Sequence, residues 1–399
     1  MALSILFVGC AYSDIQKNRF RSASRRGYQF AAQNLQEALI EGFLSNGVGV
    51  NVISIPSLST FPLGSSIIEV EDCDYVYKGH VLGHCFGYHN IPFFKSFKHE
   101  EIDEWVDNWY ASAQGIRCIF VYALIGTHMS IALRAKQRYP DVLISIIVPD
   151  LPMFMGSNMV YKALGLQKKA IDWINENVRC FDRYVVLTEP MVNRLGVADK
   201  PYTVLEGVYS GRNEQITISK NEDIIILYAG GLVMRYGIKD LIDAFMKIDG
   251  DRFRLWLCGA GDAIGYIKEC MRKDNRIVYY GTVPESEIGV LQKKATVLVN
   301  PRHSNEEFTK YSFPSKTIEY MASGTPTLMC HLPSIPPEYD DYLYYFADES
   351  VEGMAKMMIH ICEKPAEELA NKGQRAREFI VTNKNAKIQT SKILVLLQS

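Results

Sequence analysis

Short apolar runs alternate with amphipathic segments along nearly the whole chain. Residues 143–148 are apolar at almost every position, which is typical of a central strand covered on both faces of a parallel sheet. The strand candidates of the first half are 5–8, 50–55, 118–122, 143–148 and 184–187. Helical spacing predicts helices over 30–44, 101–113, 129–137 and 166–178. This alternation predicts right-handed βαβ units in a doubly wound α/β fold.

The second half repeats the pattern. Its strand candidates are 224–228, 254–257, 277–280, 297–300 and 326–329, and its helix candidates are 239–246, 264–273, 285–293 and 315–322. A glycine-rich polar stretch at 205–214 separates the two series and is the best linker candidate. We therefore predict one domain over 1–206, a second over 207–374, and a helical segment over 375–399.

Composition narrows the class of protein. The 399 residues carry a net charge of −2, so there is no excess of positive charge to bind a nucleic acid. Nine cysteines are scattered without a C-x-x-C pair, which indicates reduced thiols. No apolar run approaches the roughly 18 residues of a membrane span, and the N-terminus lacks the basic start of a secretory signal. We expect a cytoplasmic protein, with peripheral contact to the inner membrane face left open, and with no indication of oligomeric state.

The stretch from Lys310 to Pro326 is the richest in candidate chemistry. A helix is predicted to begin at Ser315, just beyond a strand, and its unpaired N–H groups and dipole would favour a diphosphate. Lys316 places a cation in the first turn, where the dipole disfavours one, and Glu319 lies one turn further on the same face. A carboxylate there can accept both hydroxyl protons of a ribose. An ordinary surface ion pair between Lys316 and Glu319 is the alternative interpretation.

The motif around Phe313-Pro314-Ser315-Lys316, Glu319 and Gly324-Thr325-Pro326 resembles the donor site of glycosyltransferase family 4, which has the GT-B fold. Residues 228–237, 257–261 and 280–284 resemble three further strand–turn elements of that family, in order and spacing. The resemblance covers 222–330 and implies two doubly wound Rossmann-like domains facing a central cleft. It also implies a last helix that crosses back to the N-terminal, acceptor-side domain, leaving the nucleotide sugar to the C-terminal one.

The resemblance assigns roles residue by residue. Glu319 matches the glutamate that binds the donor ribose, Val283 the backbone contact to the base, and Ser315 and Lys316 the diphosphate contacts. Three positions depart from the family pattern. A second glutamate is replaced by Tyr311, an Arg and a Lys by Gly231 and Tyr236, and a His-Asp pair by Pro149-Asp150. Arg235 stands one step from Tyr236 and is the candidate substitute cation. The predicted donor-binding residues are Gly9, Gly231, Arg235, Gly259, Val283, Ser315, Lys316 and Glu319.

A loop rich in basic and aromatic residues follows the first strand. It opens at Gly9 and contains Tyr12, Arg19 and Arg21, which we predict on the acceptor side. Loops at the carboxyl ends of parallel strands face the ligand crevice, so this loop can receive a saccharide or lipid-linked saccharide. A solvated basic loop is the alternative. Asp150 also ends a strand and is the candidate acceptor-side base, with a simple Asp turn between prolines as the alternative. Asp150 and Glu319 are thus the predicted catalytic residues.

Three other patterns are set aside. The glycines at 259, 261 and 265 miss the spacing of a dinucleotide-binding turn. His80, His84 and His89 are interrupted by glycines that prevent a metal-binding helix, and Asp72-Cys73-Asp74 lacks a strong preceding strand. No metal and no cofactor are expected.

The predicted function is transfer of a hexose-type sugar from a UDP- or GDP-sugar to a glycan in polysaccharide biosynthesis, with retention of configuration implied by the resemblance. A GT-B epimerase or phosphorylase, and a non-catalytic nucleotide-sugar-binding subunit, remain as alternatives.

Overall fold

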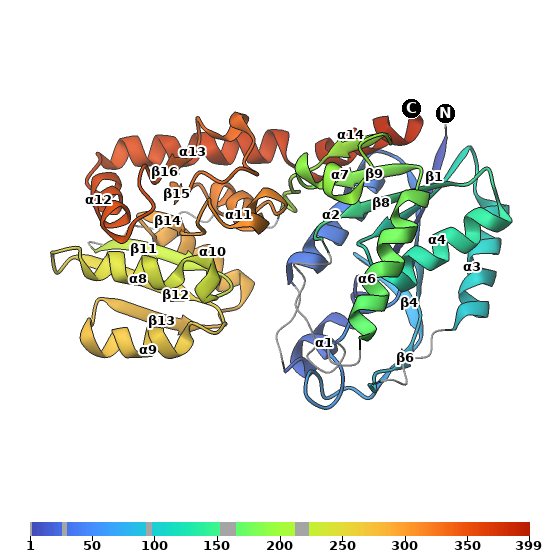
Figure 1. Cartoon of the computed structure of the whole chain (residues 1–399), viewed down its shortest axis with the longest axis horizontal. Helices are drawn as coiled ribbons and strands as arrows, with labels where there is room; N and C mark the ends of the chain where they lie inside the picture. Colours follow the sequence, from blue (N-terminus) through green and yellow to red (C-terminus); the bar gives the residue numbers. More distant parts are fainter. Residues whose placement is uncertain (1, 26–29, 93–97, 152–164, 212–222) are drawn as a thin grey trace. The chain divides into compact units, whose positions relative to one another are not determined.

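The computed structural model describes residues 2–25, 30–92, 98–151, 165–211 and 223–399. The chain forms two compact units (Figure 1). Unit 1 comprises Met1–Ser210 and Ala386–Ser399, and unit 2 comprises Gly211–Asn385. The division therefore lies slightly beyond the predicted boundary at 206/207, and residues 212–214 of the predicted linker lie outside the described residues.

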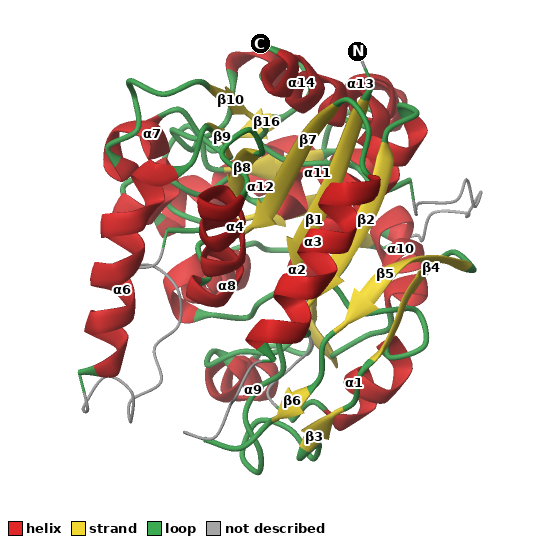
Figure 2. Cartoon of the chain, turned by 90° about the vertical axis from the view of Figure 1, so that its right-hand side faces the viewer, coloured by secondary structure: helices red, strands yellow, loops and turns green. Residues whose placement is uncertain are grey.

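Unit 1 is built on an eight-stranded sheet in the order β10-β9-β8-β7-β1-β2-β5-β4. The strands are β1 (Leu3–Gly9), β2 (Gly49–Ser54), β4 (Cys73–Tyr77), β5 (His80–Cys85), β7 (Ile116–Tyr122), β8 (Leu143–Val148), β9 (Arg183–Val186) and β10 (Tyr202–Val204). Neighbouring strands are parallel except for β4, which runs antiparallel to β5. Figure 2 shows β7, β1 and β2 as adjacent arrows, with β5 and β4 toward one edge. A two-stranded sheet, β3 (Glu69–Val70) with β6 (Tyr88–His89), is separate.

Helices cover the strands of unit 1. They are α1 (Lys17–Ala23), α2 (Phe30–Ser45), α3 (His99–Ser112), α4 (Gly126–Arg138), α6 (Leu166–Asn177), α7 (Pro190–Leu195) and α14 (Ala386–Gln398). The last of these packs on α2: the Asn46 side-chain amide donates to the Lys387 carbonyl at 2.9 Å, and Gln389 donates to the Gly207 carbonyl at 2.6 Å. The apolar face of α14 thus completes the core of unit 1, to which Ile393 and Leu397 belong.

Unit 2 contains a six-stranded, wholly parallel sheet in the order β13-β12-β11-β14-β15-β16. Its strands are β11 (Ile224–Ala229), β12 (Phe253–Cys258), β13 (Ile277–Gly281), β14 (Val297–Asn300), β15 (Thr327–Met329) and β16 (Tyr344–Tyr345). Its helices are α8 (Ile238–Met246), α9 (Ile264–Lys273), α10 (Glu285–Lys294), α11 (Ser315–Ser323), α12 (Val351–Cys362) and α13 (Ala366–Asn383). Packing of α8 with α9 and α12, and of α11 with α10 and α13, divides these helices into two groups, as a doubly wound sheet requires.

The two doubly wound domains confirm the predicted fold class, and the predicted core strands agree closely with the observed ones. The prediction missed β3, β4, β5, β6, β10, β16, α1, α7 and α12. β16 and β10 are too short to show periodicity, and β4 and β5 join at a turn that interrupts their apolar pattern with Lys78 and Gly79, both at positive φ. The predicted returning segment 375–399 begins later, since α13 stays in unit 2 and only residues from Ala386 belong to unit 1.

Candidate functional site

The strand order of unit 2 reverses between β11 and β14, because β11 connects onward to β12 on one side while β14 lies on the other. In open α/β sheets, ligands bind beyond the carboxyl ends of the strands at such a switch point. The residues that follow these two strands are Gly230 and Gly231 after β11, and Pro301 and Arg302 after β14. The chain therefore places glycine backbone and one arginine where a ligand is expected.

Lys316, in the first turn of α11, reaches this point from the other side. Its ammonium group donates to the Tyr228 hydroxyl at 3.1 Å and lies 4.7 Å from the centre of the Tyr228 ring. The Tyr228 hydroxyl in turn donates to the Gly231 carbonyl at 2.8 Å. These contacts direct the Lys316 side chain toward the end of β11, so it does more than form an ion pair on the helix surface.

Gly230 leaves the room that the Lys316 ammonium group occupies. A Cβ atom built at Gly230, where φ is +155°, would lie 1.5 Å from Lys316 Nζ and 1.7 Å from Cε. No side chain other than hydrogen fits there without displacing the lysine. The glycine of this turn is therefore explained by the close approach of a cation.

Arg302 is the second cation of the site, and the sequence analysis missed it. Its guanidinium group lies 4.5 Å from the centre of the Tyr236 ring and 5.1 Å from that of Phe308. Its positive charge contributes to lowering the pKa of Lys316, so the two cations are close enough to repel each other. Two adjacent cations at a switch point form a site suited to a diphosphate. The available signal was the position of Arg302 just after a strand.

Arg235, predicted as the substitute cation, is half-exposed and pairs with Glu306 at 3.2 Å while its guanidinium group lies 4.2 Å from the Phe308 ring centre. It lies near the site, but Arg302 is the arginine whose charge acts on Lys316.

Gly259 has a structural explanation: a Cβ atom there would lie 1.8 Å from the Gly230 carbonyl oxygen. Val283 packs its side chain against the core of unit 2, and its backbone role stays a prediction.

Helix α11 presents its N-terminus to the same region. Ser315 and Glu319 are exposed, and no side chain among the described residues caps the helix start. Tyr320 holds the helix against β11, because its hydroxyl accepts from the Ala229 N–H at 2.8 Å and donates to the Ala229 carbonyl at 3.1 Å. The negative charge of Glu319 raises the pKa of Lys316, opposing the effect of Arg302. Lys316 and Glu319 are therefore neighbours in the way the sequence predicted.

The pKa of Lys316 is lowered from 10.5 to about 8, first by burial and then by the charge of Arg302. Because the ammonium form exists below this pKa, affinity for an anionic ligand should be complete at pH 7 and should fall as the pH rises above about 8. We expect up to about tenfold weaker UDP binding per pH unit beyond that point, measured by calorimetry between pH 7 and 9.5. Lys316→Met should show a flatter profile; equal slopes in both proteins would exclude Lys316 as the titrating group.

In unit 1, the predicted acceptor-side residues Tyr12, Arg19 and Arg21 and the predicted donor-binding residue Gly9 all have close neighbours within the unit. Tyr12 is buried, and its hydroxyl donates to the Ser57 carbonyl at 2.5 Å while its backbone N–H donates to Gln33. Arg19 is exposed and pairs with Glu71 at 3.1 Å, and Arg21 is exposed and lies over the Phe30 ring. Gly9 faces α2, since a Cβ atom there would lie 2.4 Å from Gln36 Oε1. These contacts are structural; ligand roles for these four residues stay predictions.

Asp150 is exposed at the carboxyl end of β8, next to β7. Burial raises the pKa of Tyr122 at the end of β7, and the charges of Cys10 and Asp150 add smaller contributions. Ala123 follows with φ +65°, an uncommon conformation for a residue with a Cβ atom. Buried His128 holds this turn through Nδ1, 3.0 Å from the Tyr122 carbonyl, and burial lowers its pKa to about 4. Asp150 thus lies at the end of β8, next to the turn after β7 that His128 holds. Residues 152–164 lie outside the described part of the chain.

The patterns that were set aside have structural roles. Asp72 accepts from the Gly87 N–H and pairs with Lys98 at 2.7 Å. His84 stacks on Trp105, with ring centres 5.2 Å apart, and in the described residues no metal-binding group forms with His80 and His89. Within the same residues, no helix has the length and apolar character needed to cross a membrane.

Comparison with known proteins agrees with this geometry. The whole chain has the fold of sucrose-phosphate synthase from Thermosynechococcus elongatus, with a TM-score of 0.63 at 16% identity over 100% of this chain and 98% of that one. Anabaena HepE in complex with UDP gives 0.66 at 11% identity over 99% of each chain. The lipopolysaccharide outer core galactosyltransferase WaaB gives 0.61 at 12%, again over 99% of each. The fold is that of the GT-B glycosyltransferases.

Comparison of the sequence with models of protein families finds a match within unit 2. Residues 223–364, which include every strand and the candidate site of unit 2, match the family model described as glycosyl transferases group 1. A search of curated proteins finds no match to the sequence. The fold and this match support a glycosyltransferase of the GT-B type.

Proposed function

We propose that the protein transfers a hexose-type sugar from a UDP- or GDP-sugar to a saccharide or lipid-linked saccharide acceptor, as a family 4-type enzyme of polysaccharide biosynthesis. The observation that carries the proposal is the pair of cations at the switch point of unit 2. The Lys316 ammonium group lies at the end of β11 in the room that Gly230 leaves, and Arg302 is close enough for its charge to act on Lys316.

The proposed chemistry needs little more than this pair. When the nucleoside diphosphate leaves, negative charge builds up on its oxygens, and fixed cations with helix N–H groups stabilise it. Lys316, Arg302 and the start of α11 supply these groups. Glu319 would hold the ribose by accepting from its two hydroxyl groups. Asp150 is the proposed acceptor-side base, and retention of configuration without an obligatory metal follows from the family resemblance.

We expect the reaction to release a nucleoside diphosphate only when a saccharide acceptor is present. Release measured with and without candidate glycans tests this. Release that needs inorganic phosphate, or isomerisation of the sugar without any acceptor, would indicate the phosphorylase or epimerase alternative. Tight nucleotide binding without turnover on any acceptor would indicate the non-catalytic subunit, an alternative that the Tyr311 replacement keeps open.

Glu319→Ala is expected to weaken UDP or GDP binding by about 10- to 100-fold, because hydrogen bonds to a charged group contribute about 1.5–3 kcal/mol. The residue is exposed, so stability should hardly change. Calorimetric titration of the nucleotide measures the effect, with Glu287→Ala, an exposed carboxylate on α10, as the matched control. Unchanged affinity in Glu319→Ala would remove this residue from the site.

A further inference from the structure

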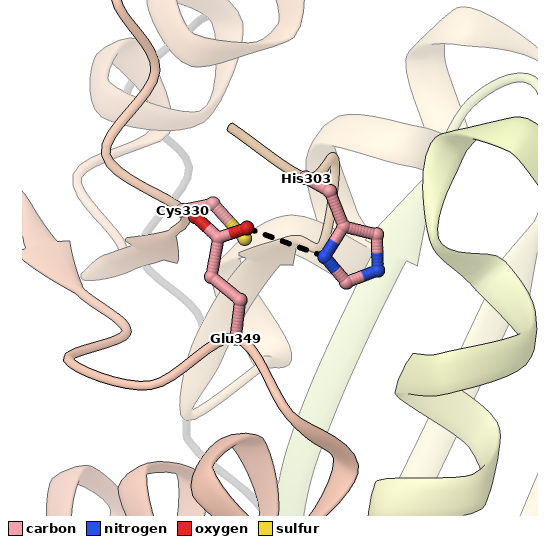
Figure 3. A group of neighbouring side chains, drawn as sticks. All are labelled: His303, Cys330 and Glu349. Atoms are coloured by element: carbon pink, nitrogen blue, oxygen red, sulfur yellow. Dashed lines mark hydrogen bonds and ion pairs between the residues drawn. The ribbon is translucent and has the colours of Figure 1, made fainter. Parts of the chain in front are cut away.

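Three side chains that can bind metals meet in unit 2 beside the candidate site. His303 follows β14, Cys330 directly follows β15, and Glu349 precedes α12. One ligand atom of each lies within 4.8 Å of the others. Figure 3 shows the three side chains next to one another. The three come from segments far apart in the sequence, so the tertiary structure alone brings them together.

The geometry of the group is close to that of a tetrahedral zinc site. His303 Nδ1 lies 3.3 Å from Glu349 Oε2. Zinc–nitrogen and zinc–oxygen bonds of about 2.0–2.2 Å at a tetrahedral angle place such ligand atoms about 3.4 Å apart. A thiolate bound at about 2.3 Å would lie about 3.6 Å from each, so the distances from Cys330 Sγ to the other two atoms need shorten by at most about 1.2 Å.

Two further contacts orient the ligands. His303 Nε2 lies 2.6 Å from Asp240 Oδ2, so the neutral imidazole would donate from Nε2 and leave the Nδ1 lone pair facing Glu349. Ser304 donates its backbone N–H to the same Glu349 oxygen at 2.9 Å. A carboxylate on the far nitrogen of a histidine is the usual outer-shell partner of a metal-bound imidazole.

A lone pair and a carboxylate that face each other at 3.3 Å need a positive charge between them. A divalent ion supplies it, and the alternative is a protonated His303 that donates from Nε2 to Asp240 and from Nδ1 to Glu349. The position of Cys330 favours the ion, because its fully buried sulfur lies within 4.8 Å of both other ligand atoms and is a donor that favours zinc over magnesium and calcium. Without a metal, the neutral thiol hydrogen-bonds to Glu349.

We propose that His303, Cys330 and Glu349 bind one divalent ion of the zinc type, with Asp240 orienting the imidazole and a water completing the tetrahedron. On binding, the Cys330 thiol gives its proton to solvent. The ion joins the ends of β14 and β15 to the start of α12, and Arg302 is the residue next to His303. The inference stands independently of the proposed reaction.

The test uses the full-length protein, freed of metal by a chelator and then titrated with Zn²⁺ against a chromophoric competitor. We expect one ion per chain, and Co²⁺ in its place should give a near-ultraviolet thiolate band. Cys330→Ser and His303→Ala should each weaken Zn²⁺ binding by at least about 100-fold. Cys362→Ser, another buried thiol of unit 2, and His331→Ala, the exposed neighbour of Cys330, are the matched controls and should bind as the wild type does.

The wild-type Co²⁺ spectrum keeps the test decisive even where a variant folds poorly. Absence of the thiolate band, or a stoichiometry far below one, overturns the proposal and favours the protonated imidazole. Wild-type affinity in both Cys330→Ser and His303→Ala also overturns it. Zn²⁺ should raise the thermal midpoint of the wild type and of the controls but not that of Glu349→Gln.

Discussion

Lys316→Met should reduce sugar transfer by about 100- to 1000-fold, the largest effect expected of any substitution in this protein. The ammonium group is the cation that reaches the end of β11, and removal of one preorganised group that stabilises developing negative charge costs about 2.7–4 kcal/mol. Initial rates at saturating acceptor measure the change. UDP affinity should fall with it, because the diphosphate is already anionic in the ground state.

Stability distinguishes this effect from damage to the fold. Burial and Arg302 lower the pKa of Lys316, which means that the folded protein disfavours the charged form. Replacement by the similarly shaped, uncharged methionine should therefore leave the thermal midpoint equal or higher. Lys268→Met, an exposed lysine on α9, is the matched control and should keep full activity. Wild-type turnover in Lys316→Met would refute the assignment of the diphosphate site.

Gly230→Ala should have nearly the same functional effect by a steric route. The new Cβ atom would lie only 1.5 Å from Lys316 Nζ, so the two atoms would clash. The flexible end of the lysine side chain must therefore move. We expect loss of transfer of about 100-fold or more, together with a stability cost of about 1–3 kcal/mol from overpacking. Gly289→Ala on α10, where nothing lies within 4 Å of the added atom, is the control.

The losses of transfer activity caused by Gly230→Ala and Lys316→Met should not be additive. If Gly230 acts by leaving room for the Lys316 side chain, the double variant Gly230→Ala/Lys316→Met should be no less active than Lys316→Met alone, since the displaced group is already absent. A double variant whose losses multiply would show that Gly230 serves the ligand directly, for example through its backbone N–H.

The position of the cations bears on one of the three departures from the family pattern, the one at Gly231 and Tyr236. The glycine and tyrosine that replace the usual Arg and Lys, Gly231 and Tyr236, lie around the site without charge, while Arg302 and Lys316 bring positive charge from the ends of β14 and the start of α11. Charge is thus supplied to one place by different segments. Tyr236 takes part as the aromatic surface on which the Arg302 guanidinium group lies.

The sequence by itself determined the elements and the fold class. Fully apolar runs such as Leu143–Val148 show a buried parallel strand because burial on both faces leaves no place for polar residues. The sequence also placed Lys316 and Glu319 on one face of a helix that begins at Ser315, because helical spacing is a local property. It could not show which strands are neighbours, since crossover connections separate adjacent strands by many residues.

Only the tertiary structure decided which residues from neighbouring strands and helices come into contact. Pairing of β14 with β11 sets Arg302 beside Lys316, and close approach of α11 gives Gly230 its function. The same packing buries Tyr12, whose predicted acceptor-side role stays a prediction, and it brings together His303, Cys330 and Glu349 from three separate segments. Contacts between distant residues form when elements pack, and local sequence patterns do not encode them.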